Sequence, residues 1–207
     1  MTTKHFAHLK DRCNLLLGKY IDPQIAAMDA ALADGGVPPD PDFDNMAACR
    51  LLIHSELECY FENRALDVIK ACEGQSALTM RNASLIALRA WMERREIDWQ
   101  RWDAPPSGVD KASFASLTSE AHGFARQFIK ANNGIKEKSV QTLSAIMGYF
   151  PDELDDVLVE DLNKYGSLRG TVAHNSWVYA TNTFESPEIE RGRVDRIIGL
   201  IEQFYEA

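Results

Sequence analysis

Residues 45–72 read NMAACRLLIHSELECYFENRALDVIKAC. Apolar side chains recur in this stretch at spacings of three and four, the period of an α-helix that buries one face. Asp44 is suitably placed to cap the start of such a helix, and Gly74 to end it. The pattern therefore predicts a long helix from about Asn45 to Cys72, whose core face consists of Leu51, Leu52, Leu57, Phe61, Ala65, Val68 and Ile69.

The same period extends over most of the chain. Further helices are predicted at about residues 4–19, 23–33, 77–99, 110–131, 137–147 and 187–205, and another from Pro151 to Gly166. Ser186 is the predicted cap of the last helix, and the apolar face of the first consists of Phe6, Leu9, Cys13, Leu16 and Leu17. Only Trp177 to Thr183 has the composition of a strand. The sequence thus predicts an all-α fold, a bundle of antiparallel helices. Residues 1–36 would form a helical segment that packs on a domain of residues 45–207, or the whole chain would form one domain.

Composition excludes several classes of protein. The 207 residues include 22 basic and 31 acidic side chains, a net charge of −9 that argues against a large surface for duplex DNA. No apolar run approaches the roughly 18 residues needed to span a membrane, and the start of the chain has no apolar signal region. The four cysteines form no CxxC pair and have no histidine at zinc-ligand spacing. We therefore expect a cytoplasmic protein with reduced, mostly buried thiols and no metal.

One segment carries candidate chemistry. Residues 164–176 read KYGSLRGTVAHNS, and no P-loop, dinucleotide fingerprint, HExxH or GxSxG motif occurs elsewhere. If Gly166 ends one helix and Ser167 caps the next, Arg169 lies in a first turn whose free N–H groups favour an anion. The guanidinium of Arg169 suits phosphate, and His174 suits proton transfer near neutral pH. An Arg and a His are in principle sufficient to cleave RNA without a metal, since the ribose 2′-hydroxyl supplies the nucleophile.

A purely structural interpretation of this pair is also open. An Arg four to six residues before a His is expected about once by chance in a chain of this composition. On a continuous helix, residues five apart point about 140° apart, so the pair needs a second chain or a helix break to form a site. Glu56 and Glu62 either line a cleft or lie on a solvated helix edge. His54 and His122 are predicted to be structural or exposed.

Arg169-Gly-Thr-Val-Ala-His174 resembles the Rx4–6H signature of the HEPN superfamily, the higher eukaryotes and prokaryotes nucleotide-binding domains. The upstream stretch SELECYFE, residues 55–62, also resembles an earlier helix of that family, which often has glutamate, aromatic and glutamate in order. The likeness covers about Asn45 to the C-terminus, and within it the RGTVAH segment is the specific part. It is nearest to the stand-alone HEPN domains of bacterial toxin and defence loci.

This resemblance implies a homodimeric, metal-independent endoribonuclease without a cofactor, acting as a toxin or anti-phage defence effector. Each protomer would supply Arg169 to the scissile phosphate and His174 as general acid or base, leaving a 2′,3′-cyclic phosphate. Asn175 and Ser176 would support the site, and an antitoxin or associated defence protein would be a partner. Where active members often carry Asn, Asp or His after the Arg, this chain has Gly170.

Two other functions remain open from the sequence. Gly170 and the acidic balance favour a catalytically inactive HEPN-like module that binds a nucleotide or a protein without cleaving RNA. The third possibility is a structural helical interaction protein, for which His174 would have no effect on toxicity.

Overall fold

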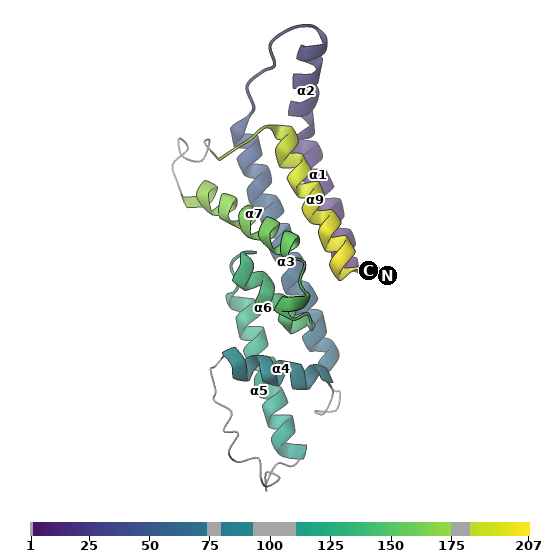
Figure 1. Ribbon diagram of the computed structural model, residues 1–207, viewed down its shortest axis with the longest axis vertical. Helices are drawn as coiled ribbons and strands as arrows, with labels where there is room; N and C mark the ends of the chain where they lie inside the picture. Colours follow the sequence, from purple (N-terminus) through teal and green to yellow (C-terminus); the bar gives the residue numbers. More distant parts are fainter. Residues whose placement is uncertain (1, 74–79, 93–110, 175–182) are drawn as a thin grey trace. The chain divides into compact units, whose positions relative to one another are not determined.

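The computed structural model of the chain describes residues 2–73, 80–92, 111–174 and 183–207, and it is helical throughout (Figure 1). No strand occurs in these ranges, which confirms the predicted all-α fold. The strand candidate at 177–183 lies outside them except for its last residue. The helices are α1 (Lys4–Tyr20), α2 (Asp22–Ala33), α3 (Phe43–Cys72), α4 (Met80–Met92), α5 (Lys111–Ala131), α6 (Glu137–Met147), α7 (Asp156–His174) and α9 (Pro187–Tyr205), with a short 3-10 turn at Pro151–Glu153.

The helices divide into two compact units. The first unit contains residues 1–61, 133–140 and 154–207, and the second contains residues 62–132 and 141–153. The first unit therefore holds α1, α2, α7, α9, the first part of α3 and the start of α6. The Arg169 segment belongs to this first unit.

Polar contacts fix the directions of the helices in the first unit. Thr3 donates its backbone N–H to Glu206 at 2.6 Å, which joins the start of α1 to the end of α9, and the two helices run antiparallel (Figure 1). Arg12 of α1 donates to Glu56 of α3 at 3.0 Å. Tyr60, further along α3, donates to the same Glu206 at 2.9 Å. Helix α1 is thus antiparallel to both α3 and α9, whereas α3 and α9 run parallel to each other.

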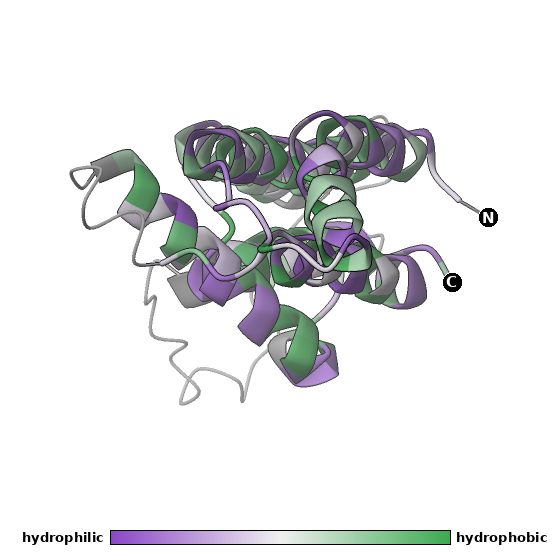
Figure 2. Cartoon of the chain, turned by 90° about the horizontal axis from the view of Figure 1, so that it is seen from above, coloured by the Kyte–Doolittle hydropathy of each residue, from purple (hydrophilic) through white to green (hydrophobic). Residues whose placement is uncertain are grey.

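The buried residues of α3 follow the predicted period only in part, since Leu51 and Val68 are partly buried, and α2 has no buried residue. Figure 2 shows hydrophobic and hydrophilic residues mixed along the helices. Leu57 and Phe61 of α3 are almost fully buried, as expected, but Leu52 is 40% exposed, so its assignment to the core is wrong. Its neighbour Ile53 is fully buried instead. Adjacent residues on a helix differ by about 100°, so only one of the two can face the core.

Helix ends follow local signals. The hydroxyl of Ser186 accepts from the backbone N–H of Ile189, as predicted for the cap of α9. Helix α3 begins two residues earlier than expected, because Asp42 and not Asp44 accepts from the N–H of Asn45, at 3.0 Å. Gly35 and Gly148 have φ values of 69° and 99° and end α2 and α6 in the left-handed conformation that glycine adopts most easily.

The thiols lie mainly in the core. Cys13, Cys49 and Cys72 are buried and free, and Cys59 is exposed and free. Burial raises the pKa of the Cys13 thiol to about 12, which makes it a poor nucleophile. Within the described ranges, no helix has both the length and the apolar character needed to cross a bilayer.

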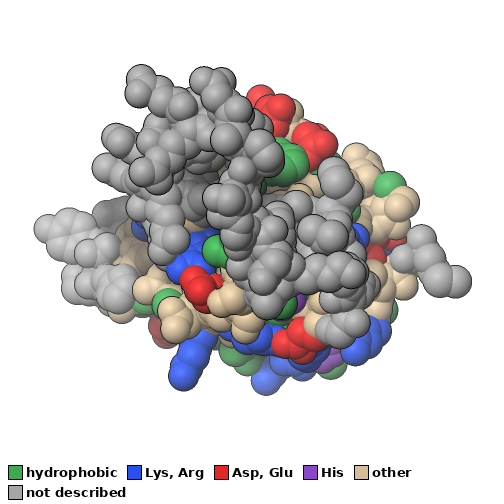
Figure 3. Space-filling model, turned by 90° about the horizontal axis from the view of Figure 1, so that it is seen from below, with side chains coloured by type: hydrophobic (Ala, Val, Ile, Leu, Met, Phe, Trp, Pro, Cys, Tyr) green, Lys and Arg blue, Asp and Glu red, His purple; other side chains and the backbone are tan. Residues whose placement is uncertain are grey.

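The second unit is held by contacts between α4 and α5. His122 of α5 is buried and hydrogen-bonded to Asn82 of α4 at 2.9 Å, so it is a structural residue. Arg89 and Arg126 pair with Glu120 and Glu73 on the surface of this unit. On the face drawn in Figure 3, the described basic and acidic side chains are interspersed and do not gather by sign.

Candidate functional site

Helix α7 carries the Arg169 segment, and its course differs from the predicted one. The expected helix from Pro151 to Gly166 was wrong at both ends: residues 151–153 form a 3-10 turn, and α7 runs from Asp156 to His174. Asp155 caps α7, accepting from the N–H of Leu158 at 3.0 Å. Ser167 therefore lies inside a helix and caps none, and the predicted anion site at a helix start before Arg169 does not exist.

Helix α7 continues past Gly166, because the backbone of Gly166 does not adopt the left-handed conformation that ends many helices. Its φ is not positive, unlike those of Gly35 and Gly148. It lies where the chain before α6 packs on α7, and a Cβ at this position would be 3.4 Å from side-chain atoms of both Ile135 and Lys136. Its small size thus serves close packing, and the usual cost of glycine inside a helix, about 1 kcal/mol relative to alanine, is accepted here.

A cavity of about 250 Å³ opens beside Arg169 within the first unit. Its wall comes from three segments: α3, the start of α6 with the residues before it, and α7. It contains glycines, two basic side chains and uncharged polar groups, namely His54, Asn133, Gly134, Lys136, Ser139, Gly166, Arg169 and Gly170. The cavity thus includes two of the predicted site residues, Arg169 and Gly170.

The charge of this cavity is positive. None of the residues that line it is acidic, although the chain as a whole carries a net charge of −9. Lys136 is exposed and Arg169 is partly exposed. Among the described residues, no carboxylate forms an ion pair with either of them, whereas Arg12, Arg191 and Arg196 of the same unit are all paired. Two cations without acidic partners are suited to an anion from outside the chain.

His54 forms the floor of the cavity from α3. Its side chain is almost fully buried, and its Nδ1 lies 3.9 Å from a carboxylate oxygen of Glu58, beyond hydrogen-bond distance. Burial, and then the positive charge of Arg169, lower the pKa of His54 to about 4. The ring is therefore neutral at pH 7, when it offers one N–H donor and one acceptor.

We expect the stability of the protein to fall as the pH drops from 6.5 towards 4, in part because of His54. Its pKa is about 4 in the folded chain against 6.5 ordinarily, so the unfolded chain binds more protons in this window. The contribution is at most about 3 kcal/mol and is fully present only above pH 6.5. Urea denaturation at pH 7.0 and 4.5 would measure it, with His54→Gln as the comparison. The same pH dependence in both proteins would show that His54 does not titrate in this way.

The other predicted site residues lie elsewhere. Glu56 of α3 is paired with Arg12 of α1, and its second carboxylate oxygen is 3.6 Å from His8. Glu62 belongs to the second unit, where it accepts from the amide of Asn132 at 2.9 Å. Neither glutamate lines the cavity. Asn175 and Ser176 lie outside the described residues, as does the side chain of His174.

The backbone of α7 relates Arg169 to His174. Both positions are on one uninterrupted helix, about 7.5 Å apart along its axis and about 140° apart around it. There is no helix break to bring them to a common point. On this helix the two residues therefore face different directions.

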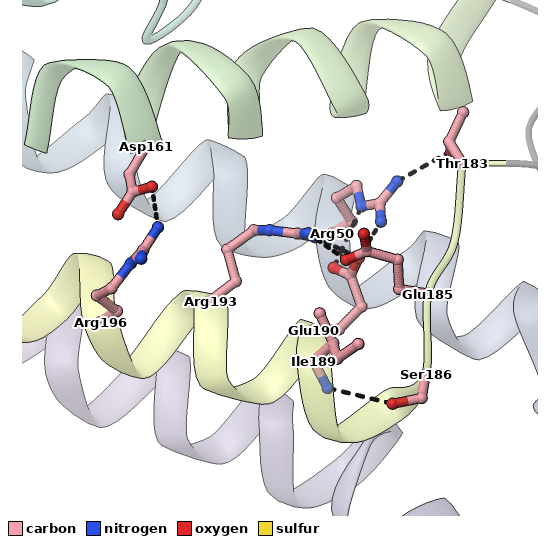
Figure 4. Close-up of polar contacts among 9 residues, drawn as sticks. All are labelled: Arg50, Asp161, Thr183, Glu185, Ser186, Ile189, Glu190, Arg193 and Arg196. Carbon is pink, nitrogen blue, oxygen red and sulfur yellow. Dashed lines mark hydrogen bonds and ion pairs between the residues drawn. The ribbon is translucent and has the colours of Figure 1, made fainter. Parts of the chain in front are cut away.

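A buried network of ion pairs and hydrogen bonds joins Thr183 and helix α9 to helix α3 (Figure 4). Arg50 of α3 is 1% exposed and pairs with Glu190 of α9. Arg50 also donates to the hydroxyl of Thr183 at 3.2 Å, and its guanidinium lies 4.1 Å from the ring centroid of Phe184. Arg193 donates to Glu190 at 2.6 Å. The network thus joins Thr183 and Phe184 to α3, and α3 to α9.

Sequence reasoning missed His54 and Lys136 as cavity residues. They are separated from Arg169 by more than thirty positions in the chain, and neither belongs to a recognisable motif. The one available signal was that His54 interrupts the apolar stripe of a long helix. Among the described residues, no cluster of three or more His, Cys, Asp or Glu side chains could hold a metal ion.

Comparison of the chain with protein-family models, with curated proteins and with solved structures finds no match.

Proposed function

We propose that this chain is a metal-independent endoribonuclease that acts as a dimer, with Arg169 and His174 as its catalytic residues. The observation that carries the proposal is the positive cavity beside Arg169, which has two cations and no acidic residue in its lining. A phosphodiester bears a negative charge that such a group of cations stabilises. The RGTVAH segment, which resembles the HEPN signature, supplies His174 five residues further along the same helix.

The proposed reaction needs a base and an acid. A neutral His174 would accept the proton of a ribose 2′-hydroxyl as its oxygen attacks the adjacent phosphorus. The P–O5′ bond then breaks, the 5′-oxygen takes up a proton, and the product strand ends in a 2′,3′-cyclic phosphate. Arg169 would stabilise the negative charge that builds up on the phosphate oxygens during this step. This reaction requires no redox step and no metal ion.

The dimer is part of the proposal for a geometric reason. Positions 169 and 174 lie about 140° apart around one continuous helix, so they cannot both face one phosphate from the same chain without a large rearrangement. Two copies of α7 that meet across a two-fold axis would bring an Arg of one chain towards a His of the other. A toxin or defence role, with an antitoxin as partner, follows from the resemblance alone.

Purified wild-type protein and His174→Ala, incubated with a mixed RNA pool in EDTA, test the activity. The expected result is cleavage by the wild type that survives chelation, leaves cyclic phosphate ends and is lost in the variant. Equal cleavage by both proteins, or none by either, would reject the ribonuclease proposal.

A second candidate is a module that binds a nucleotide without cleaving it. The observation that favours it is that the positive cavity is formed without any contribution from His174. Binding that is lost in Arg169→Ala and unchanged in His174→Ala, with no RNA turnover, would support this function over the first.

A further inference from the structure

The cavity beside Arg169 is small. Its volume is about 250 Å³, below the range of roughly 300–1,000 Å³ that accommodates drug-sized ligands. A single phosphate group fits within it, and the rest of a larger ligand would lie outside it. The residues that line the cavity include no acidic group, which favours an anion as the occupant.

The cations come from two different elements. Arg169 lies on α7, and Lys136 lies immediately before the first residue of α6. Ser139, in the first turn of α6, also lines the cavity, so the N-terminus of this 11-residue helix faces it. Backbone N–H groups in a first helical turn lack carbonyl partners within the helix, and the helix dipole adds positive potential there. The anion would thus be bound by Lys136 and Arg169 together.

His54 provides an independent indication of a ligand. It is 2% exposed yet lines the cavity, and its Nδ1 lies 3.9 Å from a carboxylate oxygen of Glu58, beyond hydrogen-bond distance. A neutral imidazole can donate one hydrogen bond to a phosphate oxygen.

Gly170 keeps the cavity open. A Cβ at this position would meet no atom of the described residues within 4 Å. An alanine here fits the helix without a clash and would project its methyl group towards the cavity. Gly170 thus differs from Gly166 on the same helix, where a Cβ would contact Ile135 and Lys136 at 3.4 Å.

We propose that this cavity binds one phosphate group of a single-stranded RNA, and that Lys136 is a positioning residue which holds that phosphate together with Arg169. The identification of RNA as the source of the phosphate rests on the proposed function. The phosphate site itself rests on Lys136, Arg169, His54 and the first turn of α6. Free inorganic phosphate has the same binding chemistry and is the alternative occupant.

Binding to a fluorescent single-stranded RNA of twelve nucleotides tests this site without requiring cleavage. The full-length His174→Ala protein serves as the background, so that RNA stays intact throughout. We expect the additional change Lys136→Gln to weaken binding about tenfold at low salt, and to reduce the slope of log K against log salt by about 0.7, the value for one phosphate contact on a single strand. Gly170→Ala should also weaken binding, with no loss of thermal stability.

Lys164→Gln is the matched control, because Lys164 is an exposed lysine on α7 that does not line the cavity. Equal weakening of RNA binding by Lys136→Gln and Lys164→Gln would overturn the site, and so would RNA binding that neither Lys136→Gln nor Gly170→Ala changes.

Titration of the same proteins with inorganic phosphate, measured by calorimetry, distinguishes RNA from free phosphate as the source of the bound group. Phosphate binding that depends on Lys136 without RNA binding would keep the anion site and reject RNA as its ligand. Lys136-dependent RNA binding without cleavage by the wild type would keep the site and reject the ribonuclease.

Discussion

His174→Ala and Arg169→Ala should each slow RNA cleavage at least about a hundredfold. General acid–base catalysis by a positioned side chain contributes on the order of 10²–10⁴ in rate, and removal of one group that stabilises transition-state charge costs about 10²–10³. Initial rates on one labelled RNA in EDTA would measure both losses. Arg169→Ala should weaken RNA binding as well, because Arg169 lines the positive cavity.

Mixing the two inactive proteins tests where the catalytic groups come from. A dimer of one Arg169→Ala chain and one His174→Ala chain retains one intact Arg and one intact His, on different chains. The uninterrupted α7 separates these two positions within a chain, so we expect the mixture to regain part of the wild-type rate. A mixture no more active than its components would show that each site uses the Arg and His of a single chain, which would contradict the dimeric site.

Two further variants control for the loss of a histidine or a charge as such. His8→Ala removes a histidine whose side chain is 66% exposed, and Arg191→Ala removes a partly exposed arginine that pairs with Asp22. Neither residue lines the cavity. Both proteins should cleave RNA at close to the wild-type rate.

The sequence predicted those features of the fold that are determined by residues close together in the chain. The bounds of α6 and the cap of α9 at Ser186 were correct because apolar period, capping hydroxyl and proline all lie within a few residues of each other. The fully buried face of α1 was also predicted correctly, from Phe6 to Leu17. Such signals need no knowledge of the tertiary structure.

The errors concern features that tertiary packing decides. Gly166 was read as a helix stop, but its small size serves the contact with Ile135 and Lys136, residues some thirty positions earlier in the chain. The cavity itself joins positions near 54, 136 and 169, and no local pattern links these segments. Arg50 was not noticed at all, because an arginine within a helical stretch is ordinarily exposed, whereas here Glu190 and Thr183 satisfy it in the core.

Glu190→Ala should lower the free energy of unfolding by about 3–5 kcal/mol, the largest stability effect that we expect of a single change. Only 6% of the Glu190 side chain is exposed, and none of the Arg50 side chain. Removing the carboxylate leaves the guanidinium of Arg50 buried, and its remaining partners among the described residues are Thr183 and the ring of Phe184. A buried charge without a counter-ion costs far more than the pair contributes when complete. Urea denaturation at pH 7 would measure the loss.

Glu202→Ala is the matched control, since Glu202 lies on the same helix and pairs with Lys10 across a surface where both side chains are nearly half exposed. An exposed ion pair of this kind contributes about 0–1 kcal/mol. The double change Arg50→Met with Glu190→Leu should recover most of the stability that Glu190→Ala loses, because it removes both charges while keeping much of the volume. If Glu190→Ala cost no more than Glu202→Ala, the Arg50 network would be too hydrated to hold Thr183 and Phe184 in place. Their position would then have to depend on the packing of Phe184 against Phe43, whose ring centroids are 5.9 Å apart.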